Sequence, residues 1–307
     1  MVSRAPEPVM TLDEWRAAGA EFRFDGHRVF YAGEGNGRPG EAVLLVHGFP
    51  TASWDWHRVW GPLADRYRLV APDMLGFGFS AKPDPHDYRI AEQADLHEEL
   101  LDLLAIDRVH VLAHDYGDTV TQELLARAVE GSARQKIQSV CFLNGGLFPE
   151  AHRARFVQTL LASRLGPLLS KLTRERAFAR GFSAIFGPDT RPSRAELHDF
   201  WRLLRHDDGH RKGHLLIRYM EERREQRERW VGALVDAGGR GIPLRFVNGA
   251  LDPVSGAHML TRYRAVVPDA DYVSLDRVGH YPQVEDPAGV LKAYFGFLRR
   301  HRFLDDD

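Results

Sequence analysis

One carboxylate, Asp115, stands where it could attack a substrate as a nucleophile. It is the centre of Ala113-His114-Asp115-Tyr116-Gly117, between an apolar run that predicts a strand and a segment that predicts a helix. Small residues two before and two after Asp115 permit a nucleophile elbow, a strained turn in which neighbouring backbone passes close. A carboxylate here needs no base before it displaces a leaving group at saturated carbon and becomes an ester. An Asp that caps the helix would fit the same pattern, so the motif alone leaves both interpretations open.

Three further motifs could complete a hydrolytic site. His47-Gly48-Phe49-Pro50 follows the most apolar predicted strand, so the N–H groups of Phe49 and Tyr116 could hold an oxyanion. Asp252 follows one later predicted strand, and His280 follows the last. The chain order is therefore nucleophile, acid, histidine, which is the order expected of a hydrolase built on an α/β sheet.

The elements that must position these residues alternate between strand and helix. Such alternation predicts an α/β fold with a mostly parallel central sheet flanked by helices. Asp25-Gly26 predicts a tight hairpin near the start, because both turn positions require positive φ. The expected strands are 21–24, 27–31, 42–46, 68–72, 109–113, 139–143, 244–248 and 271–275, and the expected helices include 93–105, 117–128 and 287–300.

The alternation stops between residues 147 and 240, where the patterning is helical. This segment carries 19 Lys or Arg against 12 Asp or Glu, although the whole chain has a net charge of -2. We expect a helical cap at 147–240, inserted after the sixth strand, and a core made of 1–146 and 241–307. Within the cap, charges spaced four apart over 218–230 predict a solvated helix.

These motifs resemble the α/β-hydrolase superfamily over roughly residues 25 to 300, and within it the branch of epoxide hydrolases and haloalkane dehalogenases. The resemblance to that branch rests on residues 47–50, 73–80 and 114–117. The chain also resembles the mesoderm-specific transcript protein group. That resemblance rests on residues 114–127, 143–153, 186–193, 229–234 and 280–287.

The resemblance implies that Asp115 is the nucleophile, that His280 activates water and that Asp252 orients His280. It favours epoxide hydrolysis to a vicinal diol, with haloalkane dehalogenation as the alternative and a non-catalytic binding protein as the alternative of another class. Epoxide hydrolases of this branch use two cap tyrosines, whereas Tyr219 is the only tyrosine between residues 147 and 240. The dehalogenase donors are also replaced, since Tyr116 follows the nucleophile and Phe49 stands in the oxyanion loop. Trp54 is a second candidate for contact with the substrate.

Charge balance and apolar content exclude some classes of binding partner. Lys plus Arg total 41 against 43 Asp plus Glu, which lacks the basic surplus of a nucleic-acid binder. One cysteine, no apolar run in residues 1–16 and no stretch long enough to span a membrane predict a cytoplasmic location. We expect a small apolar substrate, no cofactor and no metal. The oligomeric state is left open, a homodimer included.

Overall fold

The computed structural model describes residues 10–35 and 38–305. Most of residues 1–16, on which the predicted cytoplasmic location partly rests, therefore lies outside the described residues. Eight strands form one sheet in the order β1-β2-β4-β3-β5-β6-β7-β8. Pairs β1–β2 and β2–β4 are antiparallel, and all other pairs are parallel. The strands are β1 (Ala20–Phe24), β2 (His27–Glu34), β3 (Glu41–Val46), β4 (Leu69–Pro72), β5 (Arg108–His114), β6 (Lys136–Leu143), β7 (Leu244–Gly249) and β8 (Asp271–Leu275).

Each strand was predicted to within a few residues, and the hairpin prediction is confirmed. Asp25 and Gly26 have φ of 45° and 78°, the positive values that the tight turn requires. Every residue of β3 is buried, as expected for a central strand covered on both faces. Ala42, Leu44 and Val46 point into one core layer, and Val43 and Leu45 into the other.

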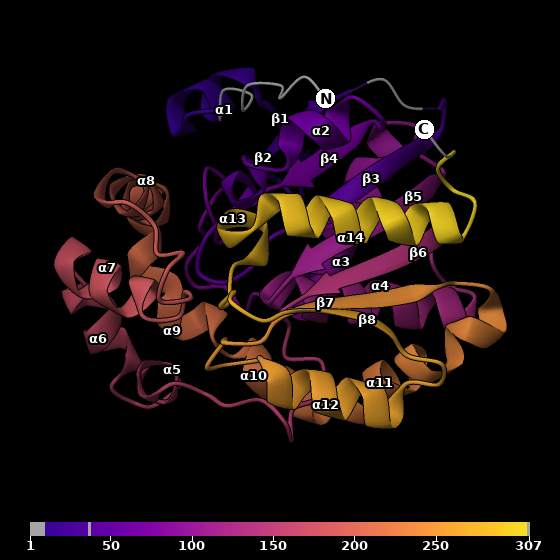
Figure 1. Ribbon diagram of the computed structural model, residues 1–307. Helices are drawn as coiled ribbons and strands as arrows, with labels where there is room; N and C mark the ends of the chain where they lie inside the picture. The colour runs from indigo at the N-terminus through magenta and orange to yellow at the C-terminus, as the bar shows by residue number, and fades with distance from the viewer. Residues whose placement is uncertain (1–9, 36–37, 306–307) are drawn as a thin grey trace, which may run out of the picture.

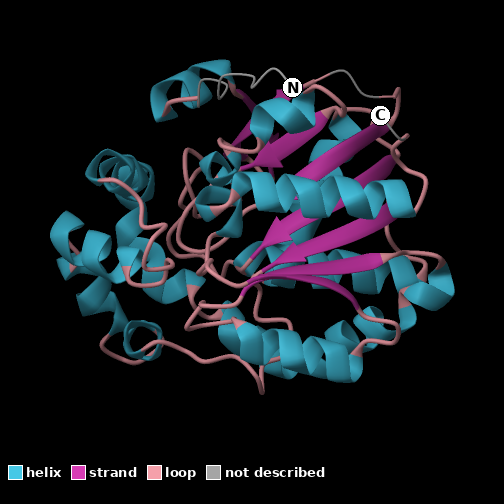
Figure 2. Cartoon of the chain, in the orientation of Figure 1, coloured by secondary structure: helices cyan, strands magenta, loops and turns pink. Residues whose placement is uncertain are grey.

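Helices cover both faces of the sheet (Figures 1 and 2). The first layer holds α3 (Ile90–Leu103), α4 (Tyr116–Glu130), α11 (Arg227–Asp236) and α12 (Ala257–Val266). The second holds α1 (Leu12–Ala18), α2 (Trp60–Ala64), α13 (Pro282–Glu285) and α14 (Pro287–Arg300). Among the described residues, no helix is long and apolar enough to cross a membrane.

The helices that follow β6 gather beside the arrowheads of the parallel strands, on the left of Figure 1. They are α5 (Phe156–Leu161), α6 (Gly166–Leu172), α7 (Glu175–Ser183), α8 (Arg194–Arg205), α9 (Gly213–Leu216) and α10 (Tyr219–Glu225), with a 3-10 turn at His206–Lys212. Another 3-10 turn, Gly238–Arg240, follows α11 and leads into β7. Short 3-10 turns also occur in the core, at Ser53–Trp56. This arrangement places the inserted helices above the strand ends that carry the candidate site.

The prediction of a solvated helix over 218–230 is only partly right, because its outer charged residues are exposed but its inner face is not. The segment divides at Gln226 into α10 and α11, and Tyr219, Arg223 and Trp230 are buried. Helix α11 packs on α4, where the indole N–H of Trp230 donates to Glu123 (2.8 Å). The end of the predicted cap therefore lies against the core, whereas the boundary at residue 240 stays a prediction.

Glu123 joins α4 to α11 and provides a test of this packing. Its buried carboxylate accepts from Trp230 and from Arg127 (2.9 Å) and also pairs with Arg229. Glu123→Ala should lower the free energy of unfolding by about 3 kcal/mol in urea titrations, because it leaves buried donors unpaired. Glu130→Ala is the matched control, since half-exposed Glu130 pairs with the same Arg229 and should contribute about 0.5 kcal/mol. Equal losses in the two variants would contradict this account.

Candidate active site

Asp115 sits in a strained turn between β5 and α4. Its φ of 49° and ψ of -104° lie where residues with a side chain are rarely found. A Cβ at Gly117 would come within 2.2 Å of the Val46 carbonyl oxygen, so only glycine fits there. Although Asp115 occupies the N-cap position of α4, its side chain makes no capping hydrogen bond. The capping interpretation left open by the sequence therefore does not account for its carboxylate.

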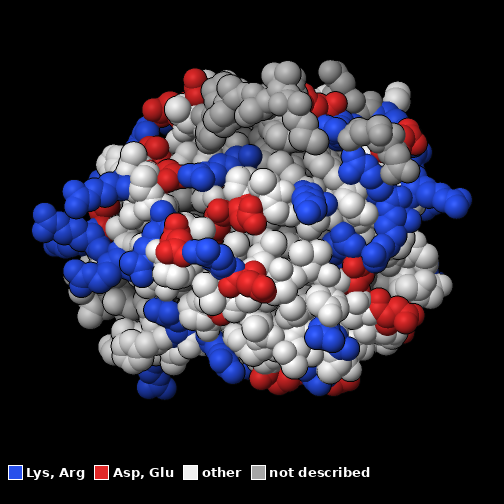
Figure 3. Space-filling model, viewed as in Figure 1, with Lys and Arg blue, Asp and Glu red and all other residues white. Residues whose placement is uncertain are grey.

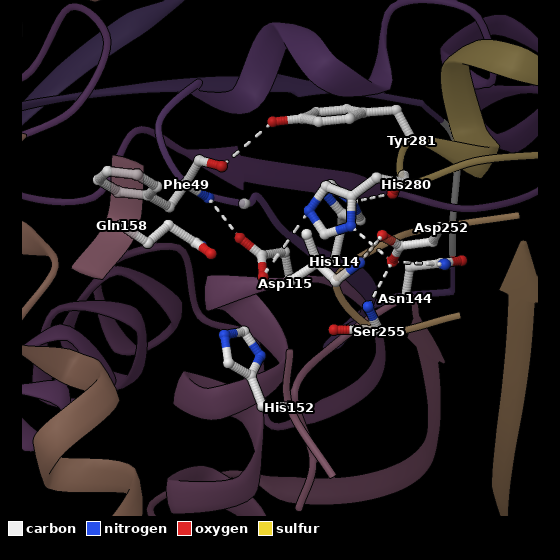
Figure 4. A network of polar contacts seen from close by, with 12 residues as sticks. Phe49, His114, Asp115, Asn144, His152, Gln158, Asp252, Ser255, His280 and Tyr281 are labelled. Carbon is white, nitrogen blue, oxygen red and sulfur yellow. Dashed lines mark hydrogen bonds and ion pairs between the residues drawn. The ribbon is translucent and has the colours of Figure 1, made fainter. Parts of the chain in front are cut away.

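The carboxylate of Asp115 instead faces a histidine and a backbone donor (Figure 4). One oxygen, Oδ2, accepts the backbone N–H of Phe49 (3.2 Å). The other, Oδ1, has no hydrogen-bond partner and lies 3.9 Å from Nε2 of His280. Asp115 is 2% exposed and His280 is 3% exposed. One carboxylate oxygen is thus free for chemistry in a site closed to solvent.

Asp252 orients His280 through a short contact. Nδ1 of His280 lies 2.8 Å from Oδ2 of Asp252, which fixes the ring with Nε2 toward Asp115. The same carboxylate accepts the N–H groups of Val254 (2.7 Å) and Ser255 (3.0 Å). These donors hold Asp252 at the end of β7, where the sequence placed it.

Two neighbours that the sequence analysis did not single out hold this arrangement. Asn144, at the end of β6, donates to Asp252 (3.0 Å) and accepts the N–H of Gly249 (2.7 Å), which ties the ends of β6 and β7 together. Nε2 of His114 lies 2.8 Å from the carbonyl oxygen of His280 and so anchors the loop that carries this histidine. The pKa of His114 is lowered to about 4, chiefly by burial and also by His280. A neutral His114 can therefore donate to that carbonyl.

The buried charges of the site support one another. Burial alone would raise the pKa of Asp115, but the nearby positive charges of His280 and Arg223 hold it below its usual range. Burial likewise opposes the charged form of His280, but Asp252 and Asp115 raise its pKa well above 6.5. These pKa shifts favour a histidinium between two carboxylates in the resting site.

Tyr219 reaches the site from α10, whereas the indole N–H of Trp54 donates to a residue outside the site. The Tyr219 ring lies 4.8 Å from that of Tyr116 and 6.4 Å from that of Phe49, and its buried hydroxyl has no partner. The indole N–H of Trp54 donates to the carbonyl of Met10 (3.2 Å), and its ring stacks on His57. The N–H of Tyr116 lies in the first turn of α4, where backbone donors lack helical partners. Its role as oxyanion donor stays a prediction.

Arg223 and His152 were missed because nothing in the local sequence marks them. Arg223 lies over the ring of Tyr219 (4.7 Å), and its Nε and Nη2 donate to the hydroxyl of Thr119 (3.1 and 2.7 Å). Nη1 lies 3.5 Å from Nδ1 of His152. The His152 ring points toward Asp115 from the opposite side to Phe49 (Figure 4). Only the fold brings these groups to the carboxylate.

No metal ligand set is present in the described part of the chain, where no three His, Cys, Asp or Glu side chains gather closely enough to hold an ion. What the arrangement offers is a free carboxylate oxygen, an oriented histidine and buried donors. Those groups suit nucleophilic displacement followed by attack of water on an ester.

Comparison with known proteins identifies the family. A family model for the α/β hydrolase fold matches residues 41–164. The bovine mesoderm-specific transcript homolog protein is 44% identical over 303 residues, which cover 95% of this chain and 89% of that protein. The chain belongs to the α/β-hydrolase superfamily. Within it, the chain groups with the mesoderm-specific transcript homologues, as the motifs predicted.

Other members share the sequence or the fold. “Putative hydrolase LipZ” of Mycobacterium tuberculosis is 39% identical over 288 residues, covering 94% of this chain and 98% of that protein. Solved haloalkane dehalogenases and epoxide hydrolases have the same fold. Dehalogenase DbeA of Bradyrhizobium elkani USDA94 superposes with a TM-score of 0.77 at 20% identity, covering 92% of this chain and 98% of that one. The chain is accordingly a hydrolase of the α/β fold.

The charge arrangement predicts an unusual titration of His280. In the folded wild type the ring should stay protonated through neutral pH and release its proton well above pH 6.5. Asp115→Asn removes one of the two anions, so the midpoint should fall. Because the folded pKa is raised, this proton stabilises the fold below about pH 6.5, and the contribution is lost as pH rises through the folded pKa. NMR titration of the histidine ring measures both midpoints, and a wild-type midpoint at or below 6.5 would refute the assignment.

Proposed function

We propose that the chain hydrolyses epoxides to vicinal diols through an ester on Asp115. The observation that carries the proposal is the unpartnered Oδ1 of Asp115, which lies 3.9 Å from Nε2 of His280. Oδ1 would attack a ring carbon, the carbon–oxygen bond would break, and the substrate oxygen would leave as an alkoxide that needs a proton. Attack would turn the charged carboxylate into a neutral ester.

Formation of the ester would switch His280 from acid to base. The charge of Asp115 is one of two that hold the proton on His280. Once that charge is lost, the pKa of His280 should fall and its proton can be released, so that Nε2 can accept one from water. The hydroxide would attack the ester carbonyl carbon, with the N–H groups of Phe49 and Tyr116 around the oxyanion, and release the diol.

Tyr219 is the proposed proton donor to the alkoxide. Burial and the charge of Asp115 raise the pKa of its hydroxyl, which keeps the proton in the resting enzyme, while Arg223 favours the phenolate. Loss of the Asp115 charge on ester formation would leave the effect of Arg223, so the tyrosine would become more acidic as the alkoxide forms. The proton that His280 releases on ester formation would restore the phenol of Tyr219, and the proton that His280 then takes from water would return the histidine to its charged resting form.

His152 is the proposed second donor, in place of the missing cap tyrosine. Burial, together with the charge of Arg223, lowers its pKa to about 3, so the ring is neutral. Nδ1 faces the N–H groups of Arg223 and can only accept there, which puts the ring proton on Nε2. That Nε2 is buried without a partner.

The alternatives fit these contacts less well. Dehalogenation would use the same carboxylate, but Trp54, the indole nearest the oxyanion loop in sequence, already donates to Met10. A non-catalytic binding protein would not need the oriented set of Asp115, His280 and Asp252. We retain dehalogenation as the second candidate reaction because the carboxylate itself does not discriminate between leaving groups.

Entry of the substrate would require the helices after β6 to move as a cap. A cavity of about 490 Å³ opens between α5 and α10. Ile217 and Met220, which flank the region of Tyr219, lie in its wall together with Thr159 of α5. We place the entrance for a small apolar substrate there, and a cytoplasmic location stays a prediction.

Intact-mass spectrometry of His280→Gln tests the reaction directly. Without the water-activating base, an ester should accumulate when the variant is incubated with a panel of terminal epoxides, and the added mass should equal the whole epoxide. Asp115→Asn should gain no mass under the same conditions. An alkyl adduct from a haloalkane panel, with the halogen lost, would move the assignment to dehalogenation. Because His280→Gln also removes a charge that helps to keep Asp115 ionised, the incubation is run at both neutral and alkaline pH. No adduct from either panel at either pH would reject both reactions.

The roles of Tyr219 and His152 as proton donors can be tested by comparing how much their removal slows esterification by two substrates with different leaving groups. Tyr219→Phe and His152→Phe should each slow esterification by an epoxide in the His280→Gln background by about 100-fold, the usual contribution of a general acid. Esterification by an alkyl bromide, whose leaving group needs no proton, should change far less. A loss of equal size for both substrates would indicate damage to the pocket rather than a missing proton donor.

A further inference from the structure

Exposed apolar side chains are concentrated on two of the helices that follow β6. Nine large apolar residues are exposed in the part of the chain that the structure describes, and five of them fall between residues 156 and 172. They are Phe156, Val157, Leu165, Leu168 and Leu172, and Phe156 is 82% exposed. Scattered exposed apolar residues need no explanation, but a group of this size marks a surface that binds something.

The geometry of α6 puts three of these leucines together. Leu165 stands at its N-cap, and Leu168 and Leu172 follow at intervals of three and four residues, which places all three on one helical face. That face is turned away from the protein, because the buried residues of α6 are Gly166 and Ser170. Helix α5 packs against α6 and adds Phe156 and Val157. We call these five residues the apolar tip.

Unpaired cations surround the apolar tip. Residues 153–180 contain seven Arg or Lys and a single acidic residue, Glu175, which pairs with His198. Arg164, Lys171, Arg174, Arg176 and Arg180 have no ion-pair partner among the described residues. Figure 3 shows Lys and Arg gathered over the edge where α6 and α7 lie in Figure 1. Elsewhere, arginines such as Arg127, Arg227 and Arg245 pair with carboxylates.

We propose that the apolar tip and its surrounding cations dock the enzyme on the surface of an anionic lipid bilayer. Phenylalanine and leucine on one face with Lys and Arg beside them is the composition of segments that lie in a membrane interface. Basic residues gain attraction from anionic headgroups, and the aliphatic side chains gain from burial among acyl chains. The docking is peripheral and does not depend on which leaving group the site accepts.

The chemistry of the patch favours a lipid surface over a protein partner. Protein interfaces carry their apolar centre within a rim of mixed polar groups, and lysine is depleted from them. Here the charges have one sign over 28 residues apart from Glu175, so the complementary surface must be broadly anionic as well as apolar. A bilayer that contains anionic lipid offers both.

Docking would also act on the active site. Helix α5 carries Gln158, which lies beside Phe49 and Asp115 in Figure 4, while its neighbours Phe156 and Val157 are exposed. A force on the exposed side of α5 is therefore applied to a helix that carries a residue facing the site. The same helix forms part of the cavity wall through Thr159. An apolar substrate dissolved in the bilayer would meet the enzyme at this helix.

Sedimentation with lipid vesicles tests the proposal on the full chain. The wild type should sediment with vesicles of phosphatidylcholine mixed with phosphatidylglycerol, bind pure phosphatidylcholine weakly, and be released as salt is raised. Phe156→Glu combined with Leu168→Glu should weaken binding about tenfold or more. Arg174→Glu combined with Arg176→Glu should do the same for anionic vesicles only.

Matched controls separate docking from general hydrophobicity. Leu103→Glu combined with Leu251→Glu changes two exposed leucines outside the patch, 63% and 48% exposed, and should leave binding unchanged. Thermal melts should match the wild type for every variant, because all these side chains are exposed. The proposal is overturned if the wild type does not bind anionic vesicles, or if the control variant loses as much as the patch variant. It is also overturned if sedimentation velocity shows a dimer that the patch variant dissolves, while vesicle binding is absent.

Discussion

Two buried carboxylates share one histidine at this site, and the rest of the structure is arranged so that the three charges can exist away from water. Asp115 and Asp252 face opposite nitrogens of His280 at 3.9 and 2.8 Å. A buried carboxylate without compensation would take up a proton and lose its nucleophilicity. The positive charge of His280 stabilises both carboxylates, and the two carboxylates together stabilise that positive charge. Removal of one charge, as the proposed ester formation would do, should change the protonation of the remaining groups.

The compensation depends on three strand ends meeting at one edge of the sheet. Asp115 follows β5, Asn144 follows β6 and Asp252 follows β7, so parallel pairing brings all three to one edge of the sheet, where Asn144 donates to Asp252. His280 comes from the loop after β8, and this loop is anchored by His114, the residue before Asp115. A rigid sheet therefore supplies the carboxylates and amide, while a loop supplies the histidine.

The inner and outer surfaces of the inserted helices differ in which side chains they bury and which they expose. Their inner surface brings Tyr219, Arg223 and His152 toward the carboxylate; Tyr219 and Arg223 are buried there, and so is Nε2 of His152. Their outer surface exposes apolar side chains and unpaired cations over α5 and α6. Arg223 is buried, and no carboxylate of the described residues lies within ion-pair distance of it. Burying a charge without such a partner lowers stability, whereas the same charge on a solvated helix would not. Both surfaces are therefore better explained by function than by stability.

The sequence by itself determined the strands, the strand-to-helix turn at Asp115 and the chain order of Asp115, Asp252 and His280. These follow from local causes: apolar runs, small residues at a tight turn, and loops that come directly after strands. Tertiary structure alone decided that the charged segment 218–230 turns Tyr219 and Arg223 inward, and that Asn144, His114 and His152 join the site. Charge spacing predicts only which residues share a helical face. Whether that face meets water or a buried carboxylate depends on contacts between residues about 70 to 110 positions apart.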